Sequence, residues 1–318
     1  MTDRGMDALR VLALVGVVVG DWLMTAAVLG PDGVLRTGSL VWPGIASLTW
    51  VYFFAEGFAN GRAGAAAPTG ATSVRRLVWP VVALVCLVTV ALIAGTVAGA
   101  PERSLYTAGK LAVSPLWPAV VLAVLTLVAR PARWLGRHPV PAWIAIAIAG
   151  AVAVVAAPDA GTLAAYVVPY LWGQLSAADR LGPRAALTLT LGGVAALVVL
   201  VGADPPSLMT MALGAALVGA ALLARPALAR WLSTPGGWRP ITALNRAALP
   251  LYLWHQSVLV VLTVVALQLS GGTPVPGLHT SPDGPWLAAR LAWLPVLALG
   301  LVALVHAMHP FTRRGSGP

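Results

Sequence analysis

Long apolar stretches follow one another along almost the whole 318-residue chain, separated by short polar gaps. A helix needs about 20 apolar residues to cross the hydrocarbon core of a bilayer, and most stretches reach or approach that length. We therefore predict an all-α fold, a polytopic membrane helix bundle of about ten transmembrane helices that forms one domain over residues 1–318. The predicted spans are Leu9–Leu29, Leu40–Phe58, Leu77–Ala100, Leu111–Ala129, Trp143–Ala157, Leu163–Ala178, Ala185–Val201, Leu208–Ala224, Leu244–Leu269 and Trp286–Met308.

Composition excludes an ordinary soluble domain. Hydrophobic residues make up 59% of the chain and charged residues only 9%, whereas soluble domains carry about a quarter charged residues. The formal net charge of +10 would suggest nucleic acid as the partner of a soluble protein. In a membrane protein the same excess of positive charge marks the cytoplasmic loops and sets the orientation of the spans. We therefore expect the lipid bilayer and no nucleic acid as the partner.

The distribution of basic residues predicts an orientation. If the N-terminus is cytoplasmic and the spans alternate, the 20 basic residues divide 16 to 4 in favour of the inner face. That asymmetry is the positive-inside pattern of multi-pass proteins, and it places both the N- and the C-terminus in the cytoplasm. The four basic residues assigned to the outer face are Arg36, Arg103, Lys110 and Arg290.

Two ionisable residues fall in the middle of predicted spans, Asp21 in the first and His255 in the ninth. Ionisable groups in lipid are costly and are functional candidates by default. At 1.5 Å per residue both lie roughly 17–18 Å from the inner face, so the two side chains are expected to meet. A carboxylate beside an imidazole suits a general base acting on a hydroxyl. A buried pair that only satisfies itself is the structural alternative.

A second set of charged residues lies at the inner face. Glu56, near the inner end of the second span, is expected to form a structural salt bridge with Arg10. Arg75 and Arg76 open the third span beside them. Guanidinium groups match phosphate oxygens, so these arginines are candidates for phosphate binding, with simple positive-inside anchoring as the alternative for Arg75.

The sequence gives little indication of a metal site or of a disulfide bond. Cys86 is the one cysteine, and His306 and His309 have helical spacing but no third ligand. We therefore predict no metal site. His279 lies in a Gly- and Pro-rich loop, Gly271–Pro285, with no evident partner. This loop is the outer segment long enough to help cover a substrate.

Five stretches together resemble one family, the bacterial acyltransferase-3 membrane proteins. They match an opening D-x-L-R-x-L-A signature, an F-F-x-x-G segment, an R-L-x-x-P entry to the third span, a P-L-W start of the fourth and a late Y-L-W-H. The stretches are Met6–Ala13, Tyr52–Asn60, Arg76–Pro80, Pro115–Trp117 and Leu251–His255, and their order covers nearly the whole chain.

The resemblance implies a membrane acyltransferase of the bacterial plasma membrane. Such a protein moves an acyl group, commonly acetyl, from cytoplasmic acyl-CoA to a hydroxyl of an extracytoplasmic carbohydrate or lipid-linked acceptor. Acyl-CoA would be a donor substrate rather than a permanently bound cofactor. The implied role of Arg10 and Arg76 is donor binding, with Arg75 beside them, and that of His255 is active-site support.

The chain departs from the family pattern at three positions. Asp21 stands where the family has a His, Thr72 where it has an Arg, and Gly173 where a His precedes Gln174. Asp21 either acts as the base itself or leaves that duty to His255, while Glu56 and Gln174 have supporting roles. Two other functions stay open: a catalytically impaired relative that acts as an accessory membrane protein, and a proton-coupled transporter.

Overall fold

The computed structural model describes residues 3–40, 47–63, 70–132, 139–156, 158–177, 182–201 and 206–313. Helices dominate these residues, and one short hairpin interrupts them. In chain order the elements are α1 (Arg4–Met24), β1 (Thr25–Leu29), β2 (Leu35–Ser39), α3 (Leu48–Ala63), α4 (Gly70–Val97), α5 (Glu102–Val113), α6 (Leu116–Ala132), α7 (Pro139–Ala156), α8 (Pro158–Ser176), α9 (Pro183–Val199), α10 (Pro206–Trp231), α11 (Pro235–Leu269) and α12 (Gly284–Arg313).

Several helices are suited to lipid. Five segments of the described residues are long and apolar enough to cross a membrane: Val78–Val97, Glu102–Leu127, Ser207–Trp231, Gly236–Leu269 and Gly284–Met308. Their outward faces are apolar, with Ile93 59% and Leu299 70% exposed. A contiguous apolar surface of this kind needs lipid or a partner to cover it. The predicted helical membrane character is thereby supported, and the other predicted spans overlap shorter or less apolar helices.

The end of the first predicted span is not helical. Leu9–Leu29 was expected to form one helix, but α1 ends at Met24 and Thr25–Leu29 is strand β1, paired antiparallel with β2. The turn between them contains Pro31, Asp32 and Gly33, and Gly33 has a φ of 71°. Pro, Asp and Gly favour a chain reversal, which converts the apolar residues before it into a hairpin strand.

A helix also occupies a segment that was expected to be a polar outer connection. Residues Glu102–Val113 form α5, which buries Ser104, Thr107 and Leu111. These small and apolar side chains recur at helical spacing between charged ones, so one face of α5 can pack while the other stays polar. Arg103 and Lys110 therefore lie on a helix rather than in a loop.

The chain divides into two compact units that are interleaved in the sequence. The first comprises residues 1–17, 43–70 and 120–246, and the second comprises 18–42, 71–119 and 247–318. Helices α1, α6 and α11 each begin in one unit and end in the other. No linker composition marks the boundaries in α1, α6 and α11, because they fall inside helices.

In the first unit, glycines allow close contact between helix backbones. Gly57 and Gly61 lie one turn apart on α3, and a Cβ at Gly57 would collide with the carbonyl of Tyr170 on α8. Gly173 on α8 meets the carbonyl of Phe54 in the same way. Small residues four apart are a typical means of packing helices in lipid, where apolar burial gives no driving force.

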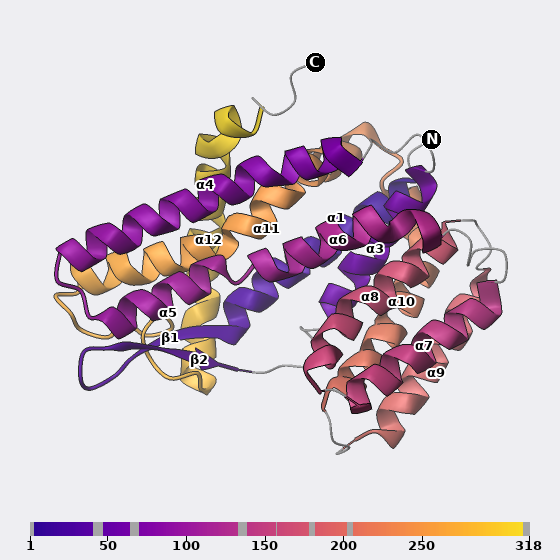
Figure 1. The fold of residues 1–318 in the computed structure, drawn as a ribbon, viewed down its shortest axis with the longest axis horizontal. Helices are drawn as coiled ribbons and strands as arrows, with labels where there is room; N and C mark the ends of the chain where they lie inside the picture. Colours follow the sequence, from indigo (N-terminus) through magenta and orange to yellow (C-terminus); the bar gives the residue numbers. More distant parts are fainter. Residues whose placement is uncertain are drawn as a thin grey trace. The chain divides into compact units, whose positions relative to one another are not determined.

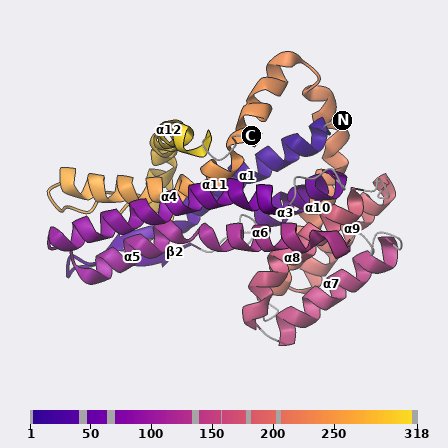
Figure 2. The ribbon, with the colours of Figure 1, turned by 45° about the horizontal axis from the view of Figure 1, so that its top comes forward.

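Helices α7, α8, α9 and α10 of this unit lie side by side in both views (Figure 1 and Figure 2). Gly193 on α9 approaches the backbone of Ala212 and Ala216 on α10. Trp172 on α8 stacks on Trp143 of α7 with ring centroids 4.8 Å apart. The unit is thus held by small residues at helix crossings and by aromatic rings between them.

Helix α1 begins in this unit at a charged cap. Asp3 accepts a hydrogen bond from the Met6 amide (3.1 Å) and pairs with Arg225, while Arg62 lies 3.6 Å away. Burial opposes ionisation of Asp3, but these bonds and charges together hold its pKa below the ordinary value. An anionic cap at the positive end of the helix dipole stabilises the start of α1.

In the second unit, the β-hairpin is held by hydrogen bonds from its neighbours. The Leu35 amide donates to Ser104 Oγ (3.0 Å), and Thr107 Oγ1 donates to the Leu35 carbonyl (3.0 Å). On the other strand, the Leu29 amide donates to the His279 carbonyl (2.9 Å). The outer backbone groups of a two-stranded sheet would otherwise lack partners, and each unpaired one is costly in an apolar setting.

Helices α4 and α5 of the second unit form an antiparallel helical hairpin (Figure 1). The contact is made through glycine, since a Cβ at Gly95 of α4 would meet Leu105, and one at Gly109 of α5 would meet Leu92. Helices α11 and α12 approach in a similar way at Val258 and Gly300. This packing positions α11, which carries His255, within the unit.

Candidate functional site

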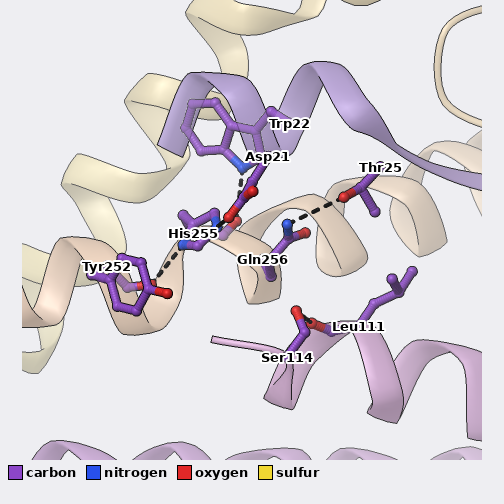
Figure 3. Close-up of polar contacts among 8 residues, drawn as sticks. All are labelled: Asp21, Trp22, Thr25, Leu111, Ser114, Tyr252, His255 and Gln256. Atoms are coloured by element: carbon purple, nitrogen blue, oxygen red, sulfur yellow. Dashed lines mark hydrogen bonds and ion pairs between the residues drawn. The ribbon is translucent and has the colours of Figure 1, made fainter. Parts of the chain in front are cut away.

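The last two turns of α1 and the middle of α11 bring Asp21 and His255 together. Asp21 Oδ2 lies 3.0 Å from His255 Nε2, and Figure 3 shows the carboxylate pointing from α1 toward the imidazole. The expected contact between these two residues, 234 positions apart in the sequence, is confirmed. Their catalytic roles stay a prediction.

Both ring nitrogens of His255 are occupied. Nδ1 donates to the backbone carbonyl of Tyr252 at 2.6 Å, while Nε2 faces the Asp21 carboxylate. A carbonyl oxygen only accepts, so the proton on Nδ1 is fixed. A second proton is then shared between Nε2 and Asp21, because two lone pairs at 3.0 Å would repel. The pair is therefore either imidazolium with carboxylate or imidazole with carboxyl.

This geometry assigns different roles to the two side chains. His255 is fully buried, whereas the Asp21 side chain is 35% exposed. Oδ1 of Asp21 makes no hydrogen bond to any residue that the structure describes, while both His255 nitrogens are committed. Of the two options the sequence left open, the arrangement favours Asp21 as the group that meets a reactant and His255 as its positioning partner.

Neighbouring side chains fix the pair in place. Trp22 Nε1 donates to the His255 carbonyl (2.9 Å), and the two rings lie 6.4 Å apart. Thr25, four residues after Asp21, accepts a hydrogen bond at its Oγ1 from Gln256 Nε2 at 3.4 Å (Figure 3). Trp22 and Thr25 thus tie the chain after Asp21 to α11, which restricts the rotamers available to the carboxylate.

In the first unit, Arg10 and Glu56 form the expected salt bridge. Both Nε and Nη2 of Arg10 lie 2.6 Å from Glu56 Oε1. The Glu56 side chain is 8% exposed and that of Arg10 is 26% exposed. A structural pair of α1 and α3 was predicted here and is confirmed.

The other predicted site residues are Gln174 and the inner arginines. Gln174 lies on α8 in the first unit, and its Oε1 is buried without a hydrogen-bond partner among the described residues. The side chains of Arg75 and Arg76, and Thr72 beside them, lie outside the described part of the structure. Their predicted roles in donor binding stay predictions, as does that of Arg10.

His279 has partners that the sequence did not reveal. It is fully buried; its Nδ1 accepts from the Val275 amide (3.1 Å), and its Nε2 donates to the Thr263 carbonyl (2.9 Å). Burial lowers the pKa of this imidazole, and the nearby Arg290 charge acts in the same direction. His279 is a loop residue, as expected, but it has hydrogen-bond partners that the sequence did not indicate. The neutral ring fastens the loop after α11.

Arg290, which the sequence assigned to the outer face, has surroundings that the sequence did not reveal. It is fully buried within the protein on α12 and donates to the Thr25 carbonyl at 2.7 Å. Its position six residues after the start of α12, inside an apolar run, was a signal that could have been read as an intramembrane charge. In the described residues no group of three His, Cys, Asp or Glu side chains is arranged to hold a metal.

Comparison with known proteins adds no relative: no family model, no curated protein and no solved structure matches the chain. The resemblance to the acyltransferase-3 family therefore rests on the motif residues. Their segments lie on or at the start of helices α1, α3, α4, α6 and α11.

Proposed function

We propose that this chain is a membrane O-acyltransferase that moves an acyl group, in the simplest case acetyl, from cytoplasmic acyl-CoA to a hydroxyl of an extracytoplasmic carbohydrate or lipid-linked acceptor. The Asp21–His255 contact carries the proposal, because it combines a held imidazole with an open carboxylate oxygen. The motif resemblance supplies the reaction class. The full proposal includes about ten spans in a bacterial plasma membrane with both termini cytoplasmic.

In the proposed reaction, Asp21 Oδ1 takes the proton of the acceptor hydroxyl as its oxygen attacks the acyl carbonyl. A new C–O bond forms, the C–S bond of the thioester breaks, and the thiolate of CoA leaves with the proton that Asp21 took up. His255 stays protonated on Nε2 and donates a hydrogen bond to Oδ2, so its positive charge compensates the negative charge that develops at the reacting atoms. The products are the ester and CoA thiol.

Donor binding is proposed for the inner arginines. Arg10 is largely neutralised by Glu56 at 2.6 Å, so Arg75 and Arg76 would carry most of the attraction for the CoA phosphates. Two adjacent guanidinium groups match the phosphate oxygens in shape and charge.

The test is transfer of labelled acetyl from acetyl-CoA to envelope glycans, in membranes that contain wild-type protein, Asp21→Asn or Asp32→Asn. Asp32 is a matched control, since it is a partly exposed carboxylate of the same unit, paired with Arg36 in the hairpin turn. We expect label and CoA thiol release with wild type and Asp32→Asn, and a loss of about 10²–10⁴-fold with Asp21→Asn. Protein level and thermal stability in the membrane are measured in parallel.

Full turnover by a folded Asp21→Asn protein would remove Asp21 from the chemistry. No label and no thiol release from intact wild type would count against acyl transfer and favour the accessory-protein alternative. Uptake coupled to protons in vesicles, without acyl transfer, would favour the transporter.

A further inference from the structure

Arg290 is a buried cation held by few protein groups. It is 0% exposed, although arginine is among the residues least often buried without a partner. One nitrogen, Nη2, donates to the Thr25 carbonyl at 2.7 Å. The guanidinium carbon lies 4.9 Å from the ring centroid of Trp286, one turn earlier on α12. These contacts offset part of the cost of burying the charge.

The rest of the guanidinium is unmatched. Nε and Nη1 are buried and donate to no atom of the described residues. Among those residues Arg290 has no carboxylate partner either, whereas Arg10, Arg36 and Arg225 each have one. A buried charge without a counter-charge costs several kcal/mol, so a group that brings negative charge to Arg290 would be bound strongly.

Arg290 also belongs to the surroundings of the catalytic pair. The carbonyl that it contacts is that of Thr25, whose hydroxyl accepts from Gln256. Thr25 follows Asp21 by one helical turn in the sequence, and Gln256 is the neighbour of His255. Gln256 Oε1 and Trp286 Nε1 are buried and unpaired among the described residues as well. These unmatched atoms belong to residues that contact one another or Thr25.

The loop between α11 and α12 covers this turn of α12. Gly277, with a φ of 77°, approaches the backbone of Ala289 and Arg290 so closely that a Cβ would meet it at 2.8 Å. Trp293 Nε1 donates to the Pro276 carbonyl (3.1 Å). Binding of a ligand to Arg290 would therefore require this loop to open, as loops over active sites do.

We propose that Arg290 anchors an oxyanion-binding site next to the Asp21–His255 pair, and that its ligand is a carboxylate or phosphate group on the acceptor. A guanidinium with free Nε and Nη1 presents two donors on one edge, which match two oxygens of such a group. The assignment to the acceptor rests on the proposed acyltransferase function. Oxyanion binding itself does not, and it is measured without an acyl donor.

The experiment measures binding to purified full-length protein by titration and by thermal shift. Methyl β-glucuronide is compared with methyl β-glucoside, which carries an uncharged hydroxymethyl group in place of the carboxylate. A second arm compares nanodiscs of phosphatidylglycerol with nanodiscs of phosphatidylcholine, so that a lipid phosphate is distinguished from a sugar carboxylate. We expect the charged member of at least one pair to bind or stabilise the wild type and the neutral member not to.

Two variants assign the effect to Arg290. Arg290→Gln should weaken binding of the charged probe by about 10- to 100-fold, the worth of a charge-assisted hydrogen bond. Arg290→Lys should keep part of it. Arg36→Gln is the matched control, because it removes an equally positive but exposed side chain from the same unit, and it should bind as the wild type does.

Each outcome of these binding measurements either supports or overturns the proposed oxyanion site. Equal response of the wild type to both members of both pairs overturns the site, even if the Arg290 variants fail to fold. Charge-selective binding that survives Arg290→Gln also overturns it. Selective binding that needs Arg290, in a protein that shows no acyl transfer, would keep the oxyanion site and reject the proposed function.

Discussion

Two acid–base pairs share helix α1 and behave differently. Arg10 and Glu56, in the first unit, form an ion pair in which two guanidinium nitrogens reach one carboxylate oxygen at 2.6 Å. Asp21 and His255, in the second unit, are joined by a single contact of 3.0 Å, with one carboxylate oxygen left open. The first pair has the geometry of a structural tie, and the second has that of a reactive group.

The chemical difference lies in the cation. A guanidinium in a protein does not give up its proton, so Arg10 can only neutralise Glu56. An imidazole nitrogen can either carry a proton or accept one, so His255 can share a proton with Asp21. Neighbouring stretches of one helix thus carry a fixed charge pair and a proton-sharing pair. The predictions below test whether stability and turnover divide between them in this way.

The largest expected effect is that of His255→Gln. Glutamine can still donate to Asp21 Oδ2 but cannot carry the positive charge, so turnover should fall on the order of 10³-fold. The loss should remain when turnover is divided by the amount of folded protein, which a merely structural role would not cause. Acetyl transfer and the yield of folded protein measure both.

Unchanged turnover per folded protein, with only the amount of folded protein reduced, would mean that His255 is a packing residue. Thr263, also buried on α11 but hydrogen-bonded to its own helix at Leu259, provides the control: Thr263→Val should leave turnover per folded protein unaltered.

Breaking the first pair should affect stability instead. Glu56→Gln leaves the guanidinium of Arg10 beside a neutral amide in a mostly buried place, which should lower the free energy of unfolding by on the order of 3 kcal/mol. The double variant Arg10→Met with Glu56→Leu removes both charges and should recover most of that loss. Chemical denaturation in detergent measures the three proteins.

The same double variant tests the proposed donor role of Arg10. If Arg10 holds a CoA phosphate, the double variant should be stable yet have a raised KM for acyl-CoA with kcat retained. An unaltered KM would restrict donor binding to Arg75 and Arg76, and a large loss of kcat would contradict the division of roles between the two pairs.

The smallest expected effect concerns pH and the loop held by His279. Burial keeps this imidazole neutral in the folded protein, and its pKa is lower than the ordinary 6.5. Below pH 6.5 the unfolded chain therefore binds more protons than the folded one, so the free energy of unfolding falls as the pH falls through that range. The unfolding temperature of wild type should decrease from pH 7 to pH 5.

In His279→Gln this decrease should be less steep, because the titrating group is gone, while the stability at pH 7 should be lower through lost hydrogen bonds to Val275 and Thr263. Equally steep pH dependence in both proteins would mean that another group is responsible.

The sequence by itself determined the helical membrane character, because the length of an apolar stretch can be read from the residues of that stretch alone. It also predicted the contacts of Asp21 with His255 and of Arg10 with Glu56. Ionisable side chains in apolar spans need partners, and residues at the same depth in the membrane were expected to pair. Chain order and spacing along α1 and α11 were enough for that.

The tertiary structure decided what depends on distant neighbours. Residues Thr25–Leu29 form a strand because β2 provides hydrogen-bond partners for their backbone, and α5 does so for β2. A short, mostly apolar stretch of this kind looks the same in a helix and in a strand. The burial of His279 and Arg290 depends on how one loop folds back over α12. The proton on Nδ1 of His255 was likewise fixed by the backbone carbonyl of Tyr252, which lies within reach because both residues are on α11. Apart from that contact, these pairings join different elements of the fold, so no local sequence pattern encodes them.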